Sequence, residues 1–339
     1  MATLKDIANL AGVSRGTVDR VLNNRGAVNQ ETAKKVLEIA QALNYHPNRA
    51  GLALATQKKK YKIGILLFSE ENPFFDEIME GVNKKSAELS DFGFTILTKR
   101  VEFDLQAQLD AIDAFCAEGI HGLLLAPYNH PDIRAKIDEL AEANIPVITV
   151  NTDIDGSKRL AYVGSDYFHG GCIAAGLFSL MTAGEIKLGI ITGSSNVLCH
   201  SERIRGLKQT LARDYPRIQV TQILENHDDE FESYALTKEL LAKNPHIDAL
   251  FFVAAGVHGG CKAIKESGLH PKVITFDEVP TTIEMLKAGV ISATISQQPL
   301  QQGFHSLGLL FDYLTSGSLP SEELNYIAHS IRIRESMEA

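Results

Sequence analysis

The fold of the amino-terminal part of the chain is indicated by residues 3–25. Their sequence is Thr-Leu-Lys-Asp-Ile-Ala-Asn-Leu-Ala-Gly-Val-Ser-Arg-Gly-Thr-Val-Asp-Arg-Val-Leu-Asn-Asn-Arg. Apolar residues recur at helical spacing on both sides of the Gly-Val-Ser segment, which predicts two short amphipathic helices. Gly12 permits a sharp turn, and the hydroxyl of Ser14 is suited to cap the second helix. This layout is that of a helix-turn-helix, whose second helix lies in a DNA groove.

The apolar residues of this segment are expected to form a small three-helix core, in which the third helix starts at about Gln30. The residues that we expect to point inward are Ile7, Leu10, Ala11, Val18, Val21, Leu22, Val36, Ile39, Ala40 and Leu43. The opposite side of the second helix presents Arg15, Gly16, Thr17, Asp19 and Arg20. An ordinary helical hairpin at a domain edge is the competing interpretation.

Charge is distributed unevenly along the 339-residue chain. Residues 1–60 contain ten Lys or Arg and four Asp or Glu, a net charge of about +6, whereas the whole chain carries −9. The remainder therefore carries about −15. A small basic head on a large acidic body indicates a protein that contacts phosphate groups with one part only, which favours DNA binding over the plain hairpin.

A dense and ungapped set of positions in the head carries a family resemblance. These positions are Thr3-Leu4, Asp6-Ile7-Ala8, Ala11-Gly12-Val13-Ser14, Thr17-Val18, Arg20-Val21-Leu22-Asn23, Thr32, Val36, Leu43, Tyr45, Pro47-Asn48 and Arg49 to Ala55. The segment resembles the DNA-binding headpiece of the lactose-repressor (LacI/GalR) family of bacterial transcription regulators. The resemblance implies a homodimer on a pseudo-palindromic operator, with one headpiece on each half-site.

The resemblance also implies DNA contacts, position by position. In the family, the two residues after the turn serine read base edges; here these are Arg15, which is suited to a guanine, and Gly16, which has no side chain. The remaining positions that match DNA contacts are Thr3, Leu4, Ser14, Thr17, Arg20, Asn23, Asn48 and Arg49. The family usually has Ser or Thr where this chain has Asp19, whose carboxylate either accepts from a cytosine amino group or orients Arg15 or Arg20.

Residues 49–56 match the family's hinge helix, which folds on operator DNA and inserts a leucine into the minor groove. Leu54 is the positional match, and the alternative is that it belongs only to the apolar face of a linker helix. Gly51 lowers helix propensity by about 1 kcal/mol relative to Ala, which fits a segment that folds on docking. The basic run Lys58-Lys59-Lys60 marks the domain boundary.

The rest of the chain alternates apolar runs with amphipathic helical patterns. The runs that we interpret as strands are Ile63–Phe68, Phe94–Thr98, Gly122–Leu125, Val147–Val150, Leu188–Ile191, Ala249–Val253, Val273–Phe276 and Ile291–Ile295. This order predicts parallel, doubly wound sheets, and the length exceeds one core, so two α/β lobes with a ligand cleft between them are expected. The region resembles the periplasmic sugar-binding fold that the same family uses as its effector domain.

These observations predict a multi-domain chain. The expected parts are an all-α headpiece at 1–48, a hinge helix and basic linker at 49–60, and a two-lobed type I periplasmic-binding-protein-like domain at 61–339, with lobe 1 at about 61–162 and 294–322 and lobe 2 at about 163–293 and 323–335.

The segment Asn72-Pro73-Phe74-Phe75 resembles the ribose-binding type, in which the Asn bonds a hydroxyl and the aromatic rings sandwich a sugar. Plain core packing at a helix start is the alternative for the two aromatic residues. Four further positional matches are polar residues that follow strands. They are Asn151, Asp153, Asp277 and Gln297.

The chain departs from the sugar-binding pattern at three places. Ser201 stands where an Arg is usual, Ala254-Ala255 where an Asn-Asp pair is usual, and Ala126 where ribose binders place an Asn. The candidates for replacing the lost contacts are Tyr128, Asn196, His200 and His258. The complete set of expected effector-binding residues is Asn72, Phe74, Phe75, Tyr128, Asn151, Asp153, Ser201, His258, Asp277 and Gln297.

Catalytic and metal-binding interpretations have little support in the sequence. His169-Gly170-Gly171-Cys172 recurs as His258-Gly259-Gly260-Cys261, but each tetrapeptide reads as a helix start in which Gly permits close packing and Cys is a small buried residue. Cys199-His200 reads as a loop dipeptide without an orienting partner. No P-loop, GxGxxG or HExxH motif is present, so we expect neither an enzyme, a cofactor nor a metal site.

The four cysteines without a CxxC pair indicate reduced thiols, and the sequence contains neither a leader-like segment nor a run of about eighteen apolar residues. We therefore expect a cytoplasmic, nucleoid-associated repressor without membrane contact, rather than a secreted solute-binding protein. The expected effector is a sugar or sugar-like molecule. The alternative is a nucleoside, sugar phosphate or other non-sugar metabolite, and the effector acts either by releasing DNA or as a corepressor.

Overall fold

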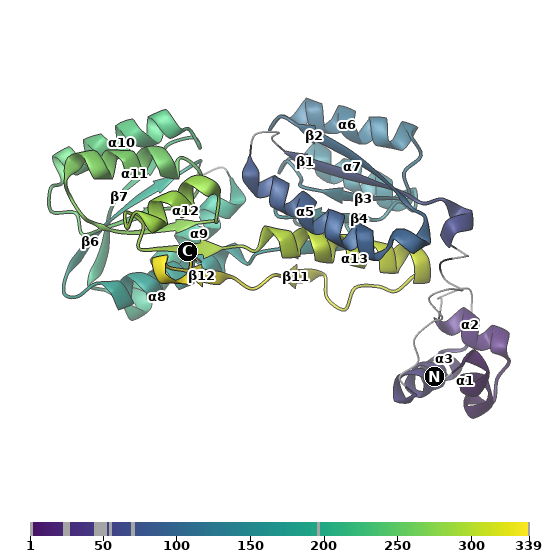
Figure 1. Cartoon of the computed structure of the whole chain (residues 1–339). Coiled ribbons are helices and arrows are strands. Elements are labelled where there is room, and N and C mark those ends of the chain that lie inside the picture. Colours follow the sequence, from purple (N-terminus) through teal and green to yellow (C-terminus); the bar gives the residue numbers. More distant parts are fainter. Residues whose placement is uncertain are drawn as a thin grey trace.

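The computed structural model describes residues 3–22, 28–43, 53, 56–68, 72–194 and 197–337. Figure 1 shows a small helical headpiece at the amino-terminal end and two larger α/β lobes side by side. The headpiece contains α1 (Leu4–Ala11), α2 (Arg15–Leu22) and α3 (Gln30–Ala42). The predicted combination of an all-α headpiece with a doubly wound, two-lobed α/β domain is confirmed.

The headpiece helices begin and end where the sequence predicts. Thr3 and Asp6 form a reciprocal capping box at the start of α1, and Gly12 ends this helix at φ 71°. The buried core of the headpiece consists of Ile7, Ala8, Ala11, Val18, Val36 and Ala40. Leu10, which we expected to point inward, is 59% exposed, because the inward stripe of α1 passes through Ala8 instead.

The first sheet is parallel throughout and forms lobe 1. Its strands are β1 (Lys62–Phe68), β2 (Thr95–Val101), β3 (Gly122–Leu125), β4 (Val147–Val150), β5 (Ala161–Gly164) and β11 (Leu324–Tyr326), in the order β11-β5-β4-β3-β1-β2. Its helical elements are α5 (Pro73–Glu88), η1 (Ser90–Phe92), α6 (Leu105–Ala117), α7 (Pro131–Glu142) and α13 (Pro299–Ser316). Helices α5 and α13 cover one face, and α6 and α7 cover the other.

The second sheet forms lobe 2 and repeats this plan. Its strands are β6 (Ile186–Thr192), β7 (Ile218–Glu225), β8 (Ala249–Phe252), β9 (Lys272–Phe276), β10 (Ala293–Ser296) and β12 (Ser330–Arg332), in the order β12-β10-β9-β8-β6-β7. Only β12 runs antiparallel to its neighbour among these described strands. The helical elements are α8 (Tyr167–Met181), α9 (Leu198–Asp214), α10 (Glu230–Lys243), α11 (Val257–Ser267), α12 (Pro280–Lys287) and η2 (Arg334–Ser336).

Strand pairing moves the lobe boundaries by a few residues from those expected. Strand β10 pairs with β9 and β12, so residues 294–296 belong to lobe 2 rather than lobe 1. Strand β11 pairs with β5, so residues 324–326 belong to lobe 1 rather than lobe 2. The chain passes between the lobes in the irregular residues that follow β5, β10 and β11, because a paired strand cannot leave its sheet without losing its ladder of hydrogen bonds.

Helices α5 and α13 pack closely along the lower side of the first sheet in Figure 1. Helix α5 begins beside the interlobe region and ends at Leu89 and η1. At that end, Ala53 packs against Leu89, Phe92 and Phe311, and the side chain of Gln57 donates to the carbonyl of Asp91 at 2.8 Å. The two helices therefore connect the interlobe region to the residues that lead to the headpiece.

Candidate functional site

Helix α2 presents the surface that is suited to read DNA. Arg15, Gly16 and Arg20 are exposed, and Thr17 and Asp19 are partly exposed, whereas Val18 is fully buried on the opposite face. The hydroxyl of Ser14 accepts from the amide of Thr17 at 3.0 Å, which is the predicted cap. Arg20 Nε donates to the carbonyl of Gly16 at 3.2 Å, so this side chain lies along the exposed face of the helix.

Two other expected DNA contacts have roles within the headpiece. The hydroxyl of Thr3 donates to the Asp6 carboxylate at 2.7 Å, and Leu4 packs against the headpiece core. Neither role excludes a DNA contact, because Thr3 remains exposed at the surface. The expected contacts at Asn23, Asn48, Arg49 and Leu54 lie outside the described residues.

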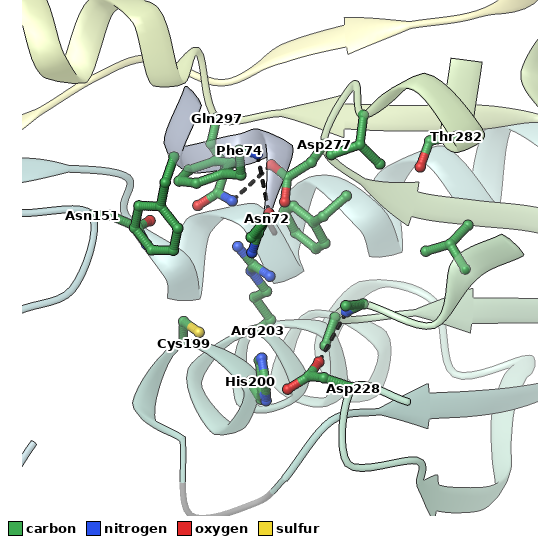
Figure 2. Close-up of a pocket in the computed structure, with 16 residues that line it drawn as sticks. Asn72, Phe74, Asn151, Cys199, His200, Arg203, Asp228, Asp277, Thr282 and Gln297 are labelled. Atoms are coloured by element: carbon green, nitrogen blue, oxygen red, sulfur yellow. Dashed lines mark hydrogen bonds between the residues drawn. The ribbon is translucent and has the colours of Figure 1, made fainter. Parts of the chain in front are cut away.

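A pocket of about 260 Å³ lies between the lobes, where the carboxyl ends of strands from both sheets meet. Its volume is close to the lower end of small-molecule sites, about 300 Å³. Figure 2 shows its polar side chains pointing toward a common space. The lining residues are Asn72, Phe74, Phe75, Asn151, Cys199, His200, Arg203, Asp228, Ala254, Ala255, Val257, Phe276, Asp277, Val279, Thr282 and Gln297.

Lobe 1 contributes the start of α5 to this pocket. Asn72 caps the helix, because its Oδ1 accepts from the amide of Phe74 at 3.0 Å. The rings of Phe74 and Phe75 are buried and meet edge to face, with their centroids 5.6 Å apart. Asn151 follows β4 with φ 64°, a conformation that Asn tolerates better than most residues. Because the helix cap uses only the side-chain oxygen of Asn72, the NH₂ group of this side chain can donate to a ligand.

The carboxylate of Asp277 and the amide of Gln297 form a connected pair on the pocket wall. Gln297 Nε2 donates to Asp277 Oδ1 at 2.8 Å. Gln297 is 3% exposed, and its Oε1 has no hydrogen-bond partner among the described residues. Burial raises the pKa of Asp277, although the guanidinium of Arg203 and the bond from Gln297 oppose this rise.

Arg203 is one of the pocket residues that the sequence analysis missed. It lies on α9, is 4% exposed, donates through Nη1 to the carbonyl of Val253 at 2.7 Å, and stacks its guanidinium 3.8 Å from the ring centroid of Phe276. Its Nε has no partner among the described residues. The segment 202–206 contains this arginine, but the resemblance pointed to position 201 as the place of an arginine contact. Position 201 lies about half a helical turn from position 203.

A second group of polar side chains lies on the lobe 2 side of the pocket. Asp228 accepts from the amide of Ala255 at 3.0 Å, and His200 Nδ1 lies 3.1 Å from the amide nitrogen of Ser194. Burial lowers the pKa of His200, but the charges of Cys199 and Asp228 outweigh burial and raise that pKa above its usual value. The Cys199-His200 pair lies in the first turn of α9, not in the loop that we expected.

The ten expected effector contacts divide into two groups. Those that the structure brings together are Asn72, Phe74, Phe75, Asn151, Asp277 and Gln297, and those that lie outside this pocket are Tyr128, Asp153, Ser201 and His258. Of the proposed replacements for lost contacts, His200 lines the pocket, and Asn196 lies outside the described residues. The replacements that only the structure identifies are Arg203 and Asp228.

Four expected contacts have structural roles elsewhere. Asp153 is buried in a bidentate ion pair with Arg159, with both N–O distances between 2.5 and 2.6 Å. Tyr128 stacks on Phe103 at 4.7 Å between centroids. The hydroxyl of Ser201 donates to the carbonyl of Leu198 at 3.1 Å, and His258 lies in the first turn of α11 with a buried Nδ1. Ser201 lies outside the pocket because of the direction in which its side chain leaves the helix, which sequence position alone does not reveal.

The repeated His-Gly-Gly-Cys segments serve close helix packing. A Cβ on Gly171 would lie 2.0 Å from the carbonyl oxygen of Arg203, and one on Gly259 would lie 1.9 Å from that of Glu230. Within the described ranges, no cluster of three or more His, Cys, Asp or Glu side chains is arranged to hold a metal ion. In the same ranges, no helix is both long and apolar enough to cross a membrane.

Comparison with known proteins agrees with both parts of the structure. Residues 3–48 match the family described as "Bacterial regulatory proteins, lacI family", and residues 63–318 match the "Periplasmic binding protein domain". The ribose operon repressor of Haemophilus influenzae is 31% identical over 279 residues, 79% of this chain and 78% of the relative. The ribose operon repressor of Bacillus subtilis is 27% identical over 83% of this chain and 82% of the relative.

Among solved structures, the glucose-galactose binding protein GanP of Geobacillus stearothermophilus matches with a TM-score of 0.74 at 23% identity, covering 83% of this chain and 100% of that one. This likeness shows the two-lobed fold. A helix-turn-helix headpiece, with α2 suited to lie in a DNA groove, joined to a two-lobed domain with an interlobe pocket, defines a DNA-binding transcriptional regulator with an effector site. The chain belongs to the lacI family of bacterial regulatory proteins.

Proposed function

We propose that this regulator is a cytoplasmic, homodimeric repressor whose effector is a monosaccharide-sized, hydroxyl-bearing molecule bound in the interlobe pocket. The observation that carries the proposal is the unused hydrogen-bonding capacity on the pocket wall. Gln297 Oε1 and Arg203 Nε are buried without partners among the described residues, and both belong to side chains that line the pocket. A buried polar atom without a partner costs about 1–3 kcal/mol, which a ligand hydroxyl would offset.

The composition of the pocket supports a sugar over the non-sugar alternatives. Planar amide, carboxylate and guanidinium groups from Asn72, Asp277 and Arg203 suit hydroxyls that both donate and accept, and the aromatic rings offer faces to C–H groups. Relatives named as ribose operon repressors point the same way. A nucleoside or sugar phosphate is therefore not the favoured effector.

The α5–α13 pair offers a physical route from the pocket to the headpiece. Helix α5 has 16 residues, a length of about 24 Å at 1.5 Å per residue. Phe74 and Phe75 lie at its pocket end, and Ala53 and Gln57 contact the residues that follow its other end. A ligand that changes the arrangement of the lobes also moves helix α5. The affinity of the protein for its operator then changes by the ratio of the ligand's affinities for the two lobe arrangements.

The homodimer is supported by exposed apolar side chains on the α/β domain. Phe103 in lobe 1 is 56% exposed, and in lobe 2 Ile223 and Phe231 are 41% and 86% exposed. Apolar side chains that form a contiguous exposed patch are typical of surfaces that another protein covers, and the dimer proposal takes these three residues as parts of such a surface. Two copies with a twofold axis would present two reading helices to a pseudo-palindromic operator.

The test uses the full chain. We would titrate it calorimetrically with a panel of pentoses, hexoses, nucleosides and sugar phosphates, and measure anisotropy with a duplex selected from random sequences for binding. The proposal expects a sugar to bind and to change the affinity for the duplex. Binding of the non-sugar compounds alone would refute the effector assignment. Mass spectrometry of the released ligand completes the test, because a regulator releases its effector without changing it chemically, whereas an enzyme would not.

A further inference from the structure

We propose that Cys199 is a covalent modification site inside the interlobe pocket, where its sulfur adds to small α,β-unsaturated carbonyl compounds. Cys199 lines the pocket from the first turn of α9. Figure 2 shows its sulfur together with His200 and Arg203 on the α9 side of the pocket. The proposed sugar site uses the guanidinium of Arg203, but it does not explain why a thiol and an imidazole lie beside that guanidinium.

The backbone around Cys199 favours an anion. Helix α9 is 17 residues long, and its N-cap residue, Val197, supplies no side-chain hydrogen bond to the first turn. The amides of His200 and Ser201 donate to the carbonyl of Val197, and the start of the helix places the positive end of its dipole near Cys199. Arg203 follows one turn later on the same helix, with its guanidinium buried in the pocket wall.

The neighbouring side chains favour the thiolate, which is the nucleophilic form of cysteine. Burial by itself raises the pKa of the Cys199 thiol, but the His200 imidazolium and the Arg203 guanidinium outweigh burial and lower that pKa below its ordinary value. The pKa of His200 is raised in turn. Asp228 opposes the effect on the thiol from the other side of His200 and does not reverse it.

The Nε donor of Arg203 also indicates which chemical group the electrophile carries. Arg203 Nε is a buried donor without a partner among the described residues, and it belongs to a side chain 4% exposed. A donor in this state fits a carbonyl oxygen. The pocket thus combines a nucleophile, a proton donor and an oxygen-binding group around one space of about 260 Å³.

The reaction is an addition that needs no oxidant. The Cys199 thiolate sulfur forms a bond to the β-carbon of the unsaturated carbonyl compound, and the π electrons move toward the carbonyl oxygen, which faces Arg203. The enolate that results takes a proton at its α-carbon from the His200 imidazolium. The product is a thioether with all atoms of both reactants. Its consequence for regulation rests on the proposed function, because the adduct fills the space assigned to the effector.

The other cysteines supply an internal comparison. Cys261 is fully buried, and burial raises its pKa to about 12. Burial also raises the pKa of Cys116. Cys172 is partly exposed, but its thiol donates to the carbonyl of Gly206 at 3.7 Å. We therefore expect Cys199 to react before the other three.

The experiment treats the folded full chain with N-ethylmaleimide at pH 7 and follows the mass of the intact protein and of its peptides. The expected result is one early adduct, located at Cys199 and absent in Cys199→Ser. In His200→Gln the rate at pH 7 should fall about tenfold, because loss of the imidazolium raises the thiol pKa and so lowers the fraction of thiolate. His246→Gln, a change at an exposed histidine of lobe 2, should leave the rate unchanged.

Two results would overturn the proposal. One is modification of Cys172 or Cys116 at the rate of Cys199 in protein that circular dichroism shows to be folded. The other is a rate of Cys199 modification that rises only as the pH passes through about 8.5, the ordinary pKa of a cysteine thiol. Both readouts are obtained without effector or DNA, so they are independent of the sugar assignment. Loss of sugar binding after labelling, measured separately, tests the regulatory consequence.

Discussion

Gly81 of α5 and Gly303 of α13 allow the backbones of the two helices to touch. A Cβ on Gly81 would lie 1.9 Å from the carbonyl oxygen of Leu300, and a Cβ on Gly303 would lie 2.0 Å from that of Ile78. The contact atoms are backbone, which cannot rotate away as a side chain can. The two helices that connect the pocket with the contacts of Ala53 and Gln57 therefore pack backbone against backbone at two points.

Replacing Gly303 with Ala should force α5 and α13 apart. We expect a loss of about 1–3 kcal/mol in the free energy of unfolding, the usual cost of overpacking. Urea denaturation measures it. The matched control is Gly176→Ala in α8, where a Cβ meets no atom within 4 Å and the better helix propensity of Ala should leave stability unchanged or slightly raised. Equal stability of both variants would contradict the close-packing argument.

Arg203→Ala should weaken effector binding, because a hydrogen bond to a charged group contributes about 1.5–3 kcal/mol. The dissociation constant is then expected to rise by roughly ten- to a hundredfold. Calorimetric titration with the bound sugar measures this. The control is Arg205→Ala, two residues along the same helix, whose guanidinium is half exposed and paired with Glu202. An effect of similar size in the control would remove Arg203 from the site.

Replacing Arg15 and Arg20 together with Ala should abolish specific binding to the operator, since both side chains lie on the exposed face of α2. Any remaining weak binding should be insensitive to the DNA sequence. Anisotropy titrations with the selected duplex and a scrambled duplex measure the ratio. Arg213→Ala, an exposed change in lobe 2, controls for net charge. Operator binding that survives the double change would refute α2 as the reading helix.

Glu77 should make stability depend on pH near neutrality. Burial, together with the carboxylates of Glu278 and Asp277, raises the pKa of Glu77 to about 7 from an ordinary value of 4.5. Because the folded-state pKa is the higher one, its stabilising contribution is complete below about pH 4.5 and is lost as pH rises through about 7. Melting temperatures of the wild-type chain and Glu77→Gln between pH 5 and 8 should therefore diverge in slope.

The direction of that divergence is part of the prediction. The wild-type chain should lose stability relative to Glu77→Gln as pH increases, since the glutamine carries no charge at either end of the range. Glu284→Gln, at an exposed position of α12, should follow the wild-type curve. Parallel curves for the wild-type chain and Glu77→Gln would show that neither burial nor the neighbouring carboxylates raise the pKa of Glu77 in the folded protein.

Asp153→Asn tests a corrected assignment. The change removes one of the two carboxylate partners of Arg159, whose side chain is 3% exposed and also pairs with Glu323, and should cost about 1.5–3 kcal/mol of stability, the usual contribution of a hydrogen bond to a charged group. Effector affinity should be unchanged in the folded variant, because Asp153 lies outside the pocket. Asp155→Asn, an exposed neighbour, should alter neither quantity. A stable Asp153→Asn variant that fails to bind effector would restore the original interpretation.

Local patterns were sufficient for the headpiece helices and for most of the buried strands, although the buried strand β5 (Ala161–Gly164) was not predicted. The predicted runs Gly122–Leu125 and Val147–Val150 coincide with β3 and β4, because strands buried on both faces are continuous apolar runs. Strand β7 (Ile218–Glu225) was not predicted, since it lies at a sheet edge and mixes exposed polar residues with apolar ones. Leu10 was misplaced because Ala8 and Leu10 both fit a helical stripe that contains Ile7 and Ala11, and the structure buries Ala8.

The sequence by itself determined the order of the parts, because caps, periodicity and strand ends are local properties. The class of protein and six residues of the pocket followed from the family resemblance that the sequence carries. Only the tertiary structure assigned Arg203 and Asp228 to the pocket and removed Asp153 and Ser201 from it. The reason is physical: whether a side chain reaches a cleft depends on its rotation about a helix and on partners distant along the chain. The reading surface on residues 15–20 could thus be identified from the segment 3–25, whereas the chemistry of the pocket could not.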